Sequence, residues 1–118
     1  MITIKNQSYT EEQIIQCLVT CDFVISKNAL LEKEWSKFYI CDGRCWHTRG
    51  DKYKKKRTDW MEYRKKVVFL LLDNKCSTKE IGQKKKSCEK KATQKLVKEI
   101  IDLMEKKEYK YNMILFAH

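Results

Sequence analysis

The chain contains no proline and only three glycines in 118 residues. The turns of many-stranded β folds depend on these two residue types, so their scarcity favours long helices over a sandwich or a barrel. It also excludes a glycine-rich phosphate-binding loop. Since 42% of the residues are hydrophobic, the chain is too apolar to be disordered. Its length predicts one compact domain over residues 1–118.

Histidine is almost absent, with only His47 and His118, and the second is the last residue, where chains usually fray. No Ser-His-Asp order, G-x-S-x-G, H-E-x-x-H or P-loop motif occurs. The one enzymatic pairing to test is Cys45 or Cys41 as nucleophile with His47 as base, and no third group is in view to orient it. We therefore expect a protein that is not an enzyme and that needs no cofactor.

Long hydrophobic runs are missing as well. The longest, Val67 to Leu72, is far shorter than the roughly 18 residues that suggest a membrane span. The N-terminus has no basic segment followed by an apolar one, so nothing there is typical of a signal peptide. These absences predict a soluble, cytoplasmic protein. In that compartment the six cysteines, at positions 17, 21, 41, 45, 76 and 88, would be free or buried thiols rather than disulfides.

Positive charge is what the sequence has in excess. The net charge is +10, and it is unevenly distributed: residues 1–40 carry four Lys and five acidic residues, whereas residues 41–118 carry 22 Lys and Arg against 11 acidic residues. An excess of this kind attracts nucleic acid, an anionic membrane surface or an acidic protein. The last two thirds of the chain are therefore the part expected to bind a partner.

Several helix starts are marked by a capping residue with Glu or Gln three positions later, at Thr10, Asp59 and Ser77. Together with the apolar spacing they predict helices over about 10–21, 27–36, 59–73, just after Ser77 and over about 87–107. "MITIK" predicts a first strand with a turn at Asn6-Gln7, and "YKYNMILFA" a terminal strand that could pair with it. We expect an α+β fold: a small single domain of three to four helices with a central β-hairpin and short terminal strands.

The stretch 41–47, "CDGRCWH", places Asp-Gly between two β-prone runs, the strongest short signal for a two-residue hairpin turn. Such a turn would pair Cys41 with Arg44 and Ile40 with Cys45. Because successive residues of a strand alternate between faces, the two thiols would then lie on opposite faces. The prediction is a hairpin that carries the basic residues after it.

A metal knuckle is the alternative interpretation of the same stretch. The spacing is C-x3-C rather than the usual C-x-x-C, and no second matching pair lies nearby. Opposed thiols could not easily share one ion, so we expect no bound metal. The weak alternative is a zinc site formed by Cys17, Cys21, Cys45 and His47.

Two lysine-rich stretches are the candidate nucleic-acid-binding residues. Basic groups neutralise phosphates and interleaved aromatic rings stack on exposed bases. The first stretch, "RGDKYKKKR", supplies Arg49, Lys52, Tyr53, Lys54, Lys55, Lys56 and Arg57, and the second supplies Lys84, Lys85, Lys86, Lys91, Lys95 and Lys98. Trp46 and Trp60 flank the first stretch and are expected to be exposed, partner-binding aromatics. The alternative for the first stretch is a solvated loop.

The second stretch lies within "LLLDNKCSTKEIGQKKKSCEKKATQKLVKEI", which resembles the helix-turn-helix units of bacterial response regulators and sigma-like factors. The resemblance covers about a quarter of the chain, and it implies that the "STKEI" helix precedes a DNA-recognition helix. Two positions that are usually apolar in that pattern hold Lys85 and Ser87 here. A plain basic patch is therefore the alternative.

The leading functional hypothesis is non-enzymatic binding of RNA, DNA or a nucleoprotein. The other hypothesis is a small inhibitor or adaptor that docks on a host protein. In its short, Lys-rich, proline-free composition the chain is similar to small phage and mobile-element proteins, a category that includes regulators and anti-CRISPR inhibitors. That likeness makes a host nuclease or RNA-guided effector a reasonable partner to test.

Overall fold

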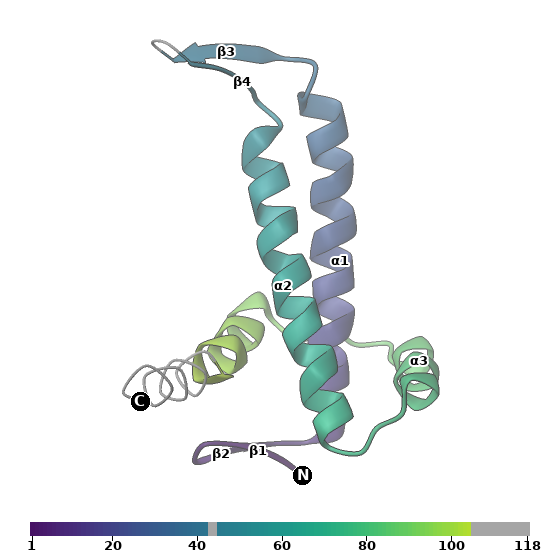
Figure 1. Ribbon diagram of the computed structural model, residues 1–118. Helices are drawn as coiled ribbons and strands as arrows, with labels where there is room; N and C mark the ends of the chain where they lie inside the picture. Colours follow the sequence, from purple (N-terminus) through teal and green to yellow (C-terminus); the bar gives the residue numbers. More distant parts are fainter. Residues whose placement is uncertain (43–44, 105–118) are drawn as a thin grey trace. The chain divides into compact units, whose positions relative to one another are not determined.

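The computed structural model describes residues 1–42 and 45–104, with the side chains of residues 40–42 and 45–47 left out. Within these residues the protein is mostly helical, with four helices and a short N-terminal β-hairpin (Figure 1). The helix-rich part of the predicted fold is therefore confirmed. The chain divides into two compact units: unit 1 comprises Met1–Thr20 and Lys66–His118, and unit 2 comprises Cys21–Lys65. The single domain over residues 1–118 stays a prediction, and each unit is described by itself.

The N-terminal hairpin belongs to unit 1 and consists of β1 (Ile2–Ile4) and β2 (Gln7–Tyr9), paired antiparallel. Ile2 and Ile4 are buried and Thr3 between them is exposed, which is the alternation expected of a half-buried strand. Lys5 lies in the turn between the two strands, where its φ is 53°. The predicted first strand is confirmed, but its partner is the next segment of the chain. The predicted C-terminal strand lies outside the described residues.

Helix α1 (Glu11–Trp35) begins at the predicted capping box. The Gln13 backbone N–H donates to Thr10 Oγ1 at 3.1 Å, and the Thr10 N–H donates to Gln13 Oε1 at 2.8 Å. The two helices predicted over 10–21 and 27–36 are one continuous helix. Neither Gly nor Pro interrupts residues 22–26, and burial of Val24 overrides the weak capping signal of Ser26.

Helix α1 also corrects the expectation that no segment has the composition of a membrane span. By length and composition it is apolar enough to cross a membrane, because only Asp22 and Lys27 carry charge between Ile14 and Leu31. In the fold, 44% of its most apolar stretch is buried, and the core helix of a soluble protein passes the same test. The cytoplasmic location stays a prediction.

Helix α2 (Asp51–Asp73) starts eight residues before the predicted start at Asp59. Lys and Arg are good helix formers, and the backbone N–H groups of Tyr53 and Lys54 both donate to the Gly50 carbonyl at 3.0 Å. The basic stretch after Gly50 is therefore the first part of a helix rather than a loop. The run "VVFLLL" is helical as predicted, with Val67 and Leu71 buried.

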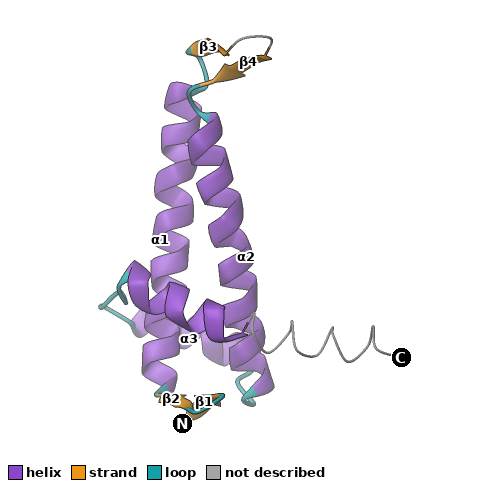
Figure 2. Cartoon of the chain, turned by 90° about the vertical axis from the view of Figure 1, so that its left-hand side faces the viewer, coloured by secondary structure: helices purple, strands orange, loops and turns teal. Residues whose placement is uncertain are grey.

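In unit 2 the second part of α1 and the first part of α2 lie side by side and antiparallel (Figure 2). Two ion pairs join them. Arg57 Nε lies 2.8 Å from Glu32 Oε2, and Arg64 Nε lies 2.6 Å from Asp22 Oδ1. Trp60 is 2% exposed, so the predicted exposure of this ring is wrong. Its side chain is buried in the core, where its ring packs against Tyr63 in a T-shaped arrangement with a centroid distance of 5.2 Å.

Strands β3 (Tyr39–Asp42) and β4 (Cys45–Thr48) are antiparallel neighbours between these two helices in the chain. The predicted register is wrong, because Cys41 pairs with Trp46 and Asp42 with Cys45. The connection itself lies outside the described residues, so the predicted central hairpin turn stays a prediction.

In unit 1 the predicted helix after Ser77 is confirmed as α3 (Thr78–Ser87), with the Ser77 side chain accepting from the Glu80 N–H. The long helix predicted over 87–107 is wrong at its start, because the fourth helix begins at residue 94. The intervening segment, residues 88–93, is held extended against α1: the Ala92 N–H donates to the Gln16 carbonyl at 3.3 Å, and Thr20 Oγ1 donates to the Ala92 carbonyl at 2.6 Å.

This segment also corrects the helix-turn-helix hypothesis. That motif needs two helices packed together across a turn of three or four residues. Here six residues separate α3 from the helix over residues 94–104, and the two helices lie on different sides of the first turns of α1 (Figure 1). Thr93 caps the later helix, with its Oγ1 accepting from the Leu96 N–H at 3.1 Å. Lys91 therefore lies in the extended segment and not on a recognition helix.

Candidate nucleic-acid interface

The first lysine-rich stretch forms a row on the surface of unit 2. A helix turns about 100° per residue, so residues at i, i+3 and i+4 share a face. Lys52, Lys55 and Lys56 have this spacing on α2, whereas Arg49 lies just before the helix and is joined to them because it lines a cavity together with Lys52. All four residues are exposed. We call these four residues the basic stripe. Lys54 is also exposed but lies more than a quarter turn away from the stripe.

Arg57 has a structural role. Its guanidinium makes a two-point contact with Glu32, through Nε to Oε2 at 2.8 Å and Nη2 to Oε1 at 3.4 Å. The hydrogen bond to Glu32 raises the pKa of Arg57. Because this pairing joins α1 to α2, the guanidinium is less available to a phosphate than the exposed lysines are.

A cavity of about 370 Å³ lies at one end of the basic stripe, lined by Trp35, Arg49, Lys52 and Tyr53. We call it the aromatic–basic cavity. Two of its side chains are half-buried rings and two are exposed cations. The Lys52 ammonium lies 4.9 Å from the centre of the Tyr53 ring, a cation–π contact. Such a lining offers ring faces to an aromatic group and positive charge to an anion.

Backbone hydrogen bonds position the cavity residues. The Phe38 N–H donates to the Trp35 carbonyl at 3.1 Å, and the Arg49 N–H donates to the Phe38 carbonyl at 2.8 Å. Gly50, next to Arg49, passes so close to α1 that a Cβ there would lie 2.8 Å from the Glu32 carbonyl oxygen. The Phe38 ring packs on Trp35 at a centroid distance of 5.4 Å. The four lining residues therefore sit on a fixed backbone.

Two aromatic residues at this site, Trp35 in the lining and Phe38 against it, were not among the residues predicted from the sequence. Phe38 is 46% exposed and Tyr39 is 69% exposed. A signal for Phe38 was present, since Phe38 and Tyr39 are two consecutive large aromatic residues next to a predicted turn, which is unusual on a solvated surface. Of the predicted partner-binding aromatics, Trp60 is buried, and the side chain of Trp46 is outside the described part of the chain.

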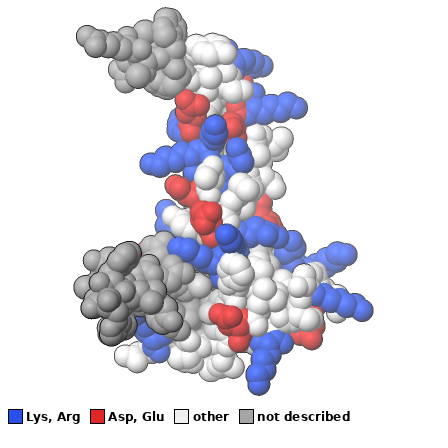
Figure 3. Space-filling view, viewed as in Figure 1, with Lys and Arg blue, Asp and Glu red and all other residues white. Residues whose placement is uncertain are grey.

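The second lysine-rich stretch is divided among α3, the extended segment and the helix over residues 94–104. Lys84 forms an ion pair with Glu11, and this hydrogen bond lowers the pKa of Glu11 and raises the pKa of Lys84. Lys86, Lys95 and Lys98 are exposed, whereas Lys85 is half-buried. Figure 3 shows basic side chains spread over the visible face of the described residues, with acidic ones among them.

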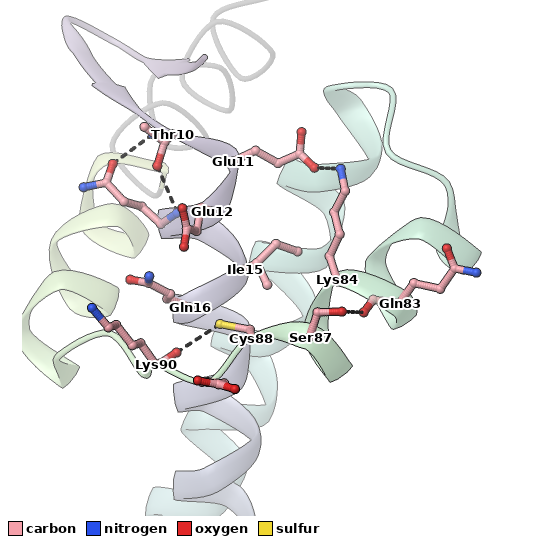
Figure 4. A pocket seen from close by; sticks show the side chains of 12 residues that line it. Thr10, Glu11, Glu12, Ile15, Gln16, Gln83, Lys84, Ser87, Cys88 and Lys90 are labelled. Carbon is pink, nitrogen blue, oxygen red and sulfur yellow. Dashed lines mark hydrogen bonds and ion pairs between the residues drawn. The ribbon is translucent and has the colours of Figure 1, made fainter.

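A second, larger cavity of about 730 Å³ lies in unit 1 between the start of α1 and the end of α3 (Figure 4). Glu11 and Lys84, which form an ion pair, both line it, and the Cys88 thiol donates to the Lys90 carbonyl at 3.0 Å. Glu12 and Glu89 also line this cavity, and both are exposed. Carboxylates repel phosphates, so this cavity is less suited to a polyanion than the aromatic–basic cavity is.

The predicted zinc alternative is only partly within the described residues. Cys17 and Cys21 are both buried, and burial raises the pKa of the Cys17 thiol to about 11. In residues 1–42 and 45–104 no group of three or more His, Cys, Asp or Glu is placed to hold an ion. The side chains of Cys45 and His47 lie outside the description, so the absence of metal stays a prediction.

Comparison of the chain with protein-family models, with curated proteins and with solved structures finds no match.

Proposed function

We propose that the protein is a non-enzymatic nucleic-acid-binding protein that contacts the phosphate backbone through the basic stripe of unit 2. The observation that carries the proposal is the joining of exposed cations and aromatic rings on one surface: Arg49 and Lys52 belong both to the stripe and to the lining of the aromatic–basic cavity. Cations in a row neutralise successive phosphates, and ring faces suit bases. The net charge of +10 adds long-range attraction to a polyanion.

The geometry supports this function better than docking to a protein partner. Three of the four stripe residues are long, flexible lysines, which are depleted at the centres of protein interfaces. Lysines at i, i+3 and i+4 form a row on one helix face, and such a row is suited to the regular spacing of phosphates. An inhibitor or adaptor that acts on a host nuclease or RNA-guided effector stays the alternative, and the binding experiment decides between the two classes.

The test is the salt dependence of binding to labelled single-stranded DNA, single-stranded RNA and duplex DNA. The stripe variant is Lys55→Gln with Lys56→Gln, which leaves the cavity unchanged. Each lost phosphate contact should flatten the slope of log K against log salt by about 0.7 for a single strand and about 0.9 for a duplex. Loss of two contacts should therefore flatten the slope for a single strand by about 1.4.

The matched control is Lys54→Gln with Lys65→Gln. Both of these lysines are exposed residues of α2, and their distance of eleven residues puts them on one side of the helix, away from the stripe. The control removes the same charge from the same helix and should leave the slope almost unchanged. Equal slopes in the two double variants would mean that net charge alone drives binding. No binding to any of the three nucleic acids at low salt would reject the proposal in favour of a protein partner.

A further inference from the structure

We propose that the aromatic–basic cavity binds one nucleoside monophosphate unit with its base unstacked, so that the protein selects unpaired nucleotides over a closed duplex. This inference rests on the proposed function, and it adds the identity of the unit that is recognised. It is carried by the composition of the cavity, whose lining consists of Trp35, Tyr53, Arg49 and Lys52.

The size of the cavity limits its occupant. At about 370 Å³ it lies near the lower end of the range of roughly 300–1,000 Å³ that is usual for small-molecule sites. A single aromatic heterocycle with its phosphate suits such a volume better than an extended peptide. The π-face of any base can stack on an aromatic side chain, so the site is expected to tolerate all bases.

The chemistry of the lining divides into two parts that match the two parts of a nucleotide. The half-buried rings of Trp35 and Tyr53 offer apolar faces to a base, and their backbones are fixed by the hydrogen bonds described above. Arg49 and Lys52 offer positive charge to the phosphate, and guanidinium forms two-point hydrogen bonds to phosphate oxygens. Lys52 already lies over the Tyr53 ring, so the cation and the ring would meet the phosphate and the base of the same nucleotide.

A base in a closed duplex has both faces stacked on its neighbours and cannot enter such a cavity without being extruded, which costs a few kcal/mol. An unpaired nucleotide avoids that cost. The unit could come from a strand or from a free nucleotide. A strand is favoured, because Lys55 and Lys56 continue the row of cations beyond the cavity, where a free mononucleotide has no further phosphates to contact.

The test compares four ligands at one salt concentration: a labelled single strand, a blunt duplex, the same duplex with an unpaired overhang, and a free nucleoside monophosphate as competitor. The single strand and the overhang should bind more tightly than the blunt duplex. Tyr53→Leu should reduce this preference by about 5- to 150-fold, the equivalent of the roughly 1–3 kcal/mol that one stacked base contributes. Tyr53→Phe keeps the ring and should keep the preference.

The outcomes separate the two proposals. Equal affinity for single strand and blunt duplex, with no effect of Tyr53→Leu, would overturn the cavity proposal and leave the proposed function standing. No binding to any nucleic acid would overturn both. A free nucleotide that binds as tightly as the strand would overturn the strand as the source. If Tyr53→Leu lowers the unfolding temperature, Arg49→Gln provides a second variant, because Arg49 is exposed and lies before the helix, and it should also weaken strand binding.

Discussion

The two lysine-rich stretches of this chain are similar in sequence but differ in what surrounds each cation. In residues 49–57 one helix places Lys52, Lys55 and Lys56 on a common face beside aromatic rings. In residues 84–98 the lysines are divided among three segments, and Lys84 is paired with Glu11 next to a cavity with further carboxylates. A density of positive charge in the sequence therefore does not by itself define a binding surface. Helical spacing and the neighbouring side chains decide whether the charges act together.

The largest expected effect is a loss of stability when the buried Trp60 of unit 2 is changed, in contrast to the exposed residues of the same unit. Trp60 is 2% exposed, so Trp60→Ala should destabilise the protein by about 3–5 kcal/mol in thermal or denaturant unfolding. Trp60→Phe keeps an apolar ring and should remain folded with unchanged affinity for nucleic acid. Tyr39→Ala, at a position that is 69% exposed, should change stability little. A folded Trp60→Phe protein that no longer bound nucleic acid would show that Trp60 belongs to the binding surface.

The burial of Cys17 in unit 1 can be tested by measuring how the stability of the protein depends on pH. Burial raises its pKa from an ordinary value of 9.0 to about 11, so folding favours the protonated thiol. The stabilisation is fully present below about pH 9 and is lost as pH rises from there through 11. A pKa difference of this size corresponds to about 3 kcal/mol. Unfolding measured between pH 8 and 11 should show this loss in the native chain.

Cys17→Ala is the control for the pH measurement, because lysines and tyrosines also titrate in this range. The variant should be less stable at every pH, since a small cavity replaces the sulfur, but it should lose less stability as pH rises. An identical pH dependence in both proteins would show that Cys17 is not buried in the way described.

A smaller change in stability is expected when one glycine from each unit is replaced by alanine. A Cβ on Gly50 would lie 2.8 Å from the Glu32 carbonyl oxygen and 3.0 Å from the Ser36 nitrogen, both backbone atoms, so Gly50→Ala should destabilise the fold by about 1–3 kcal/mol. A Cβ on Gly82, within α3, would meet nothing within 4 Å. Gly82→Ala should therefore stabilise the protein by about 0.5–1 kcal/mol. Equal effects of the two changes would remove the evidence for a close helix approach in unit 2.

Local signals in the sequence predicted local features well. The capping residues Thr10 and Ser77 each begin a helix, and the alternating "MITIK" forms a strand. Features that depend on contacts between distant residues were not predictable in this way. The extended backbone at Ala92 depends on hydrogen bonds to Gln16 and Thr20, more than seventy residues earlier in the chain. No periodicity within residues 87–107 contains that information.

In the candidate site, too, local features were predictable from the sequence and contacts between distant residues were not. The charge of residues 49–57 was evident from the sequence, and Tyr53 was among the predicted residues. The structure changes the interpretation in two ways, since Arg57 is held by Glu32 and the stretch is helical, which selects Lys52, Lys55 and Lys56 over Lys54. Trp35 could not be assigned to the site from sequence, because it comes from the end of another helix and meets Arg49 and Tyr53 only through the fold.

The most direct test of the central claim is to titrate an unlabelled single strand into ¹⁵N-labelled protein and to follow the backbone amide and tryptophan indole signals by NMR. We expect the largest chemical-shift changes at the indole of Trp35 and the amides of Arg49, Lys52 and Tyr53. Smaller changes are expected at Lys55 and Lys56. Signals of Gln83, Lys84 and Lys95 in unit 1 should move little. Shifts that concentrate on α3 and the helix over residues 94–104, or shifts spread evenly over all exposed lysines, would contradict it.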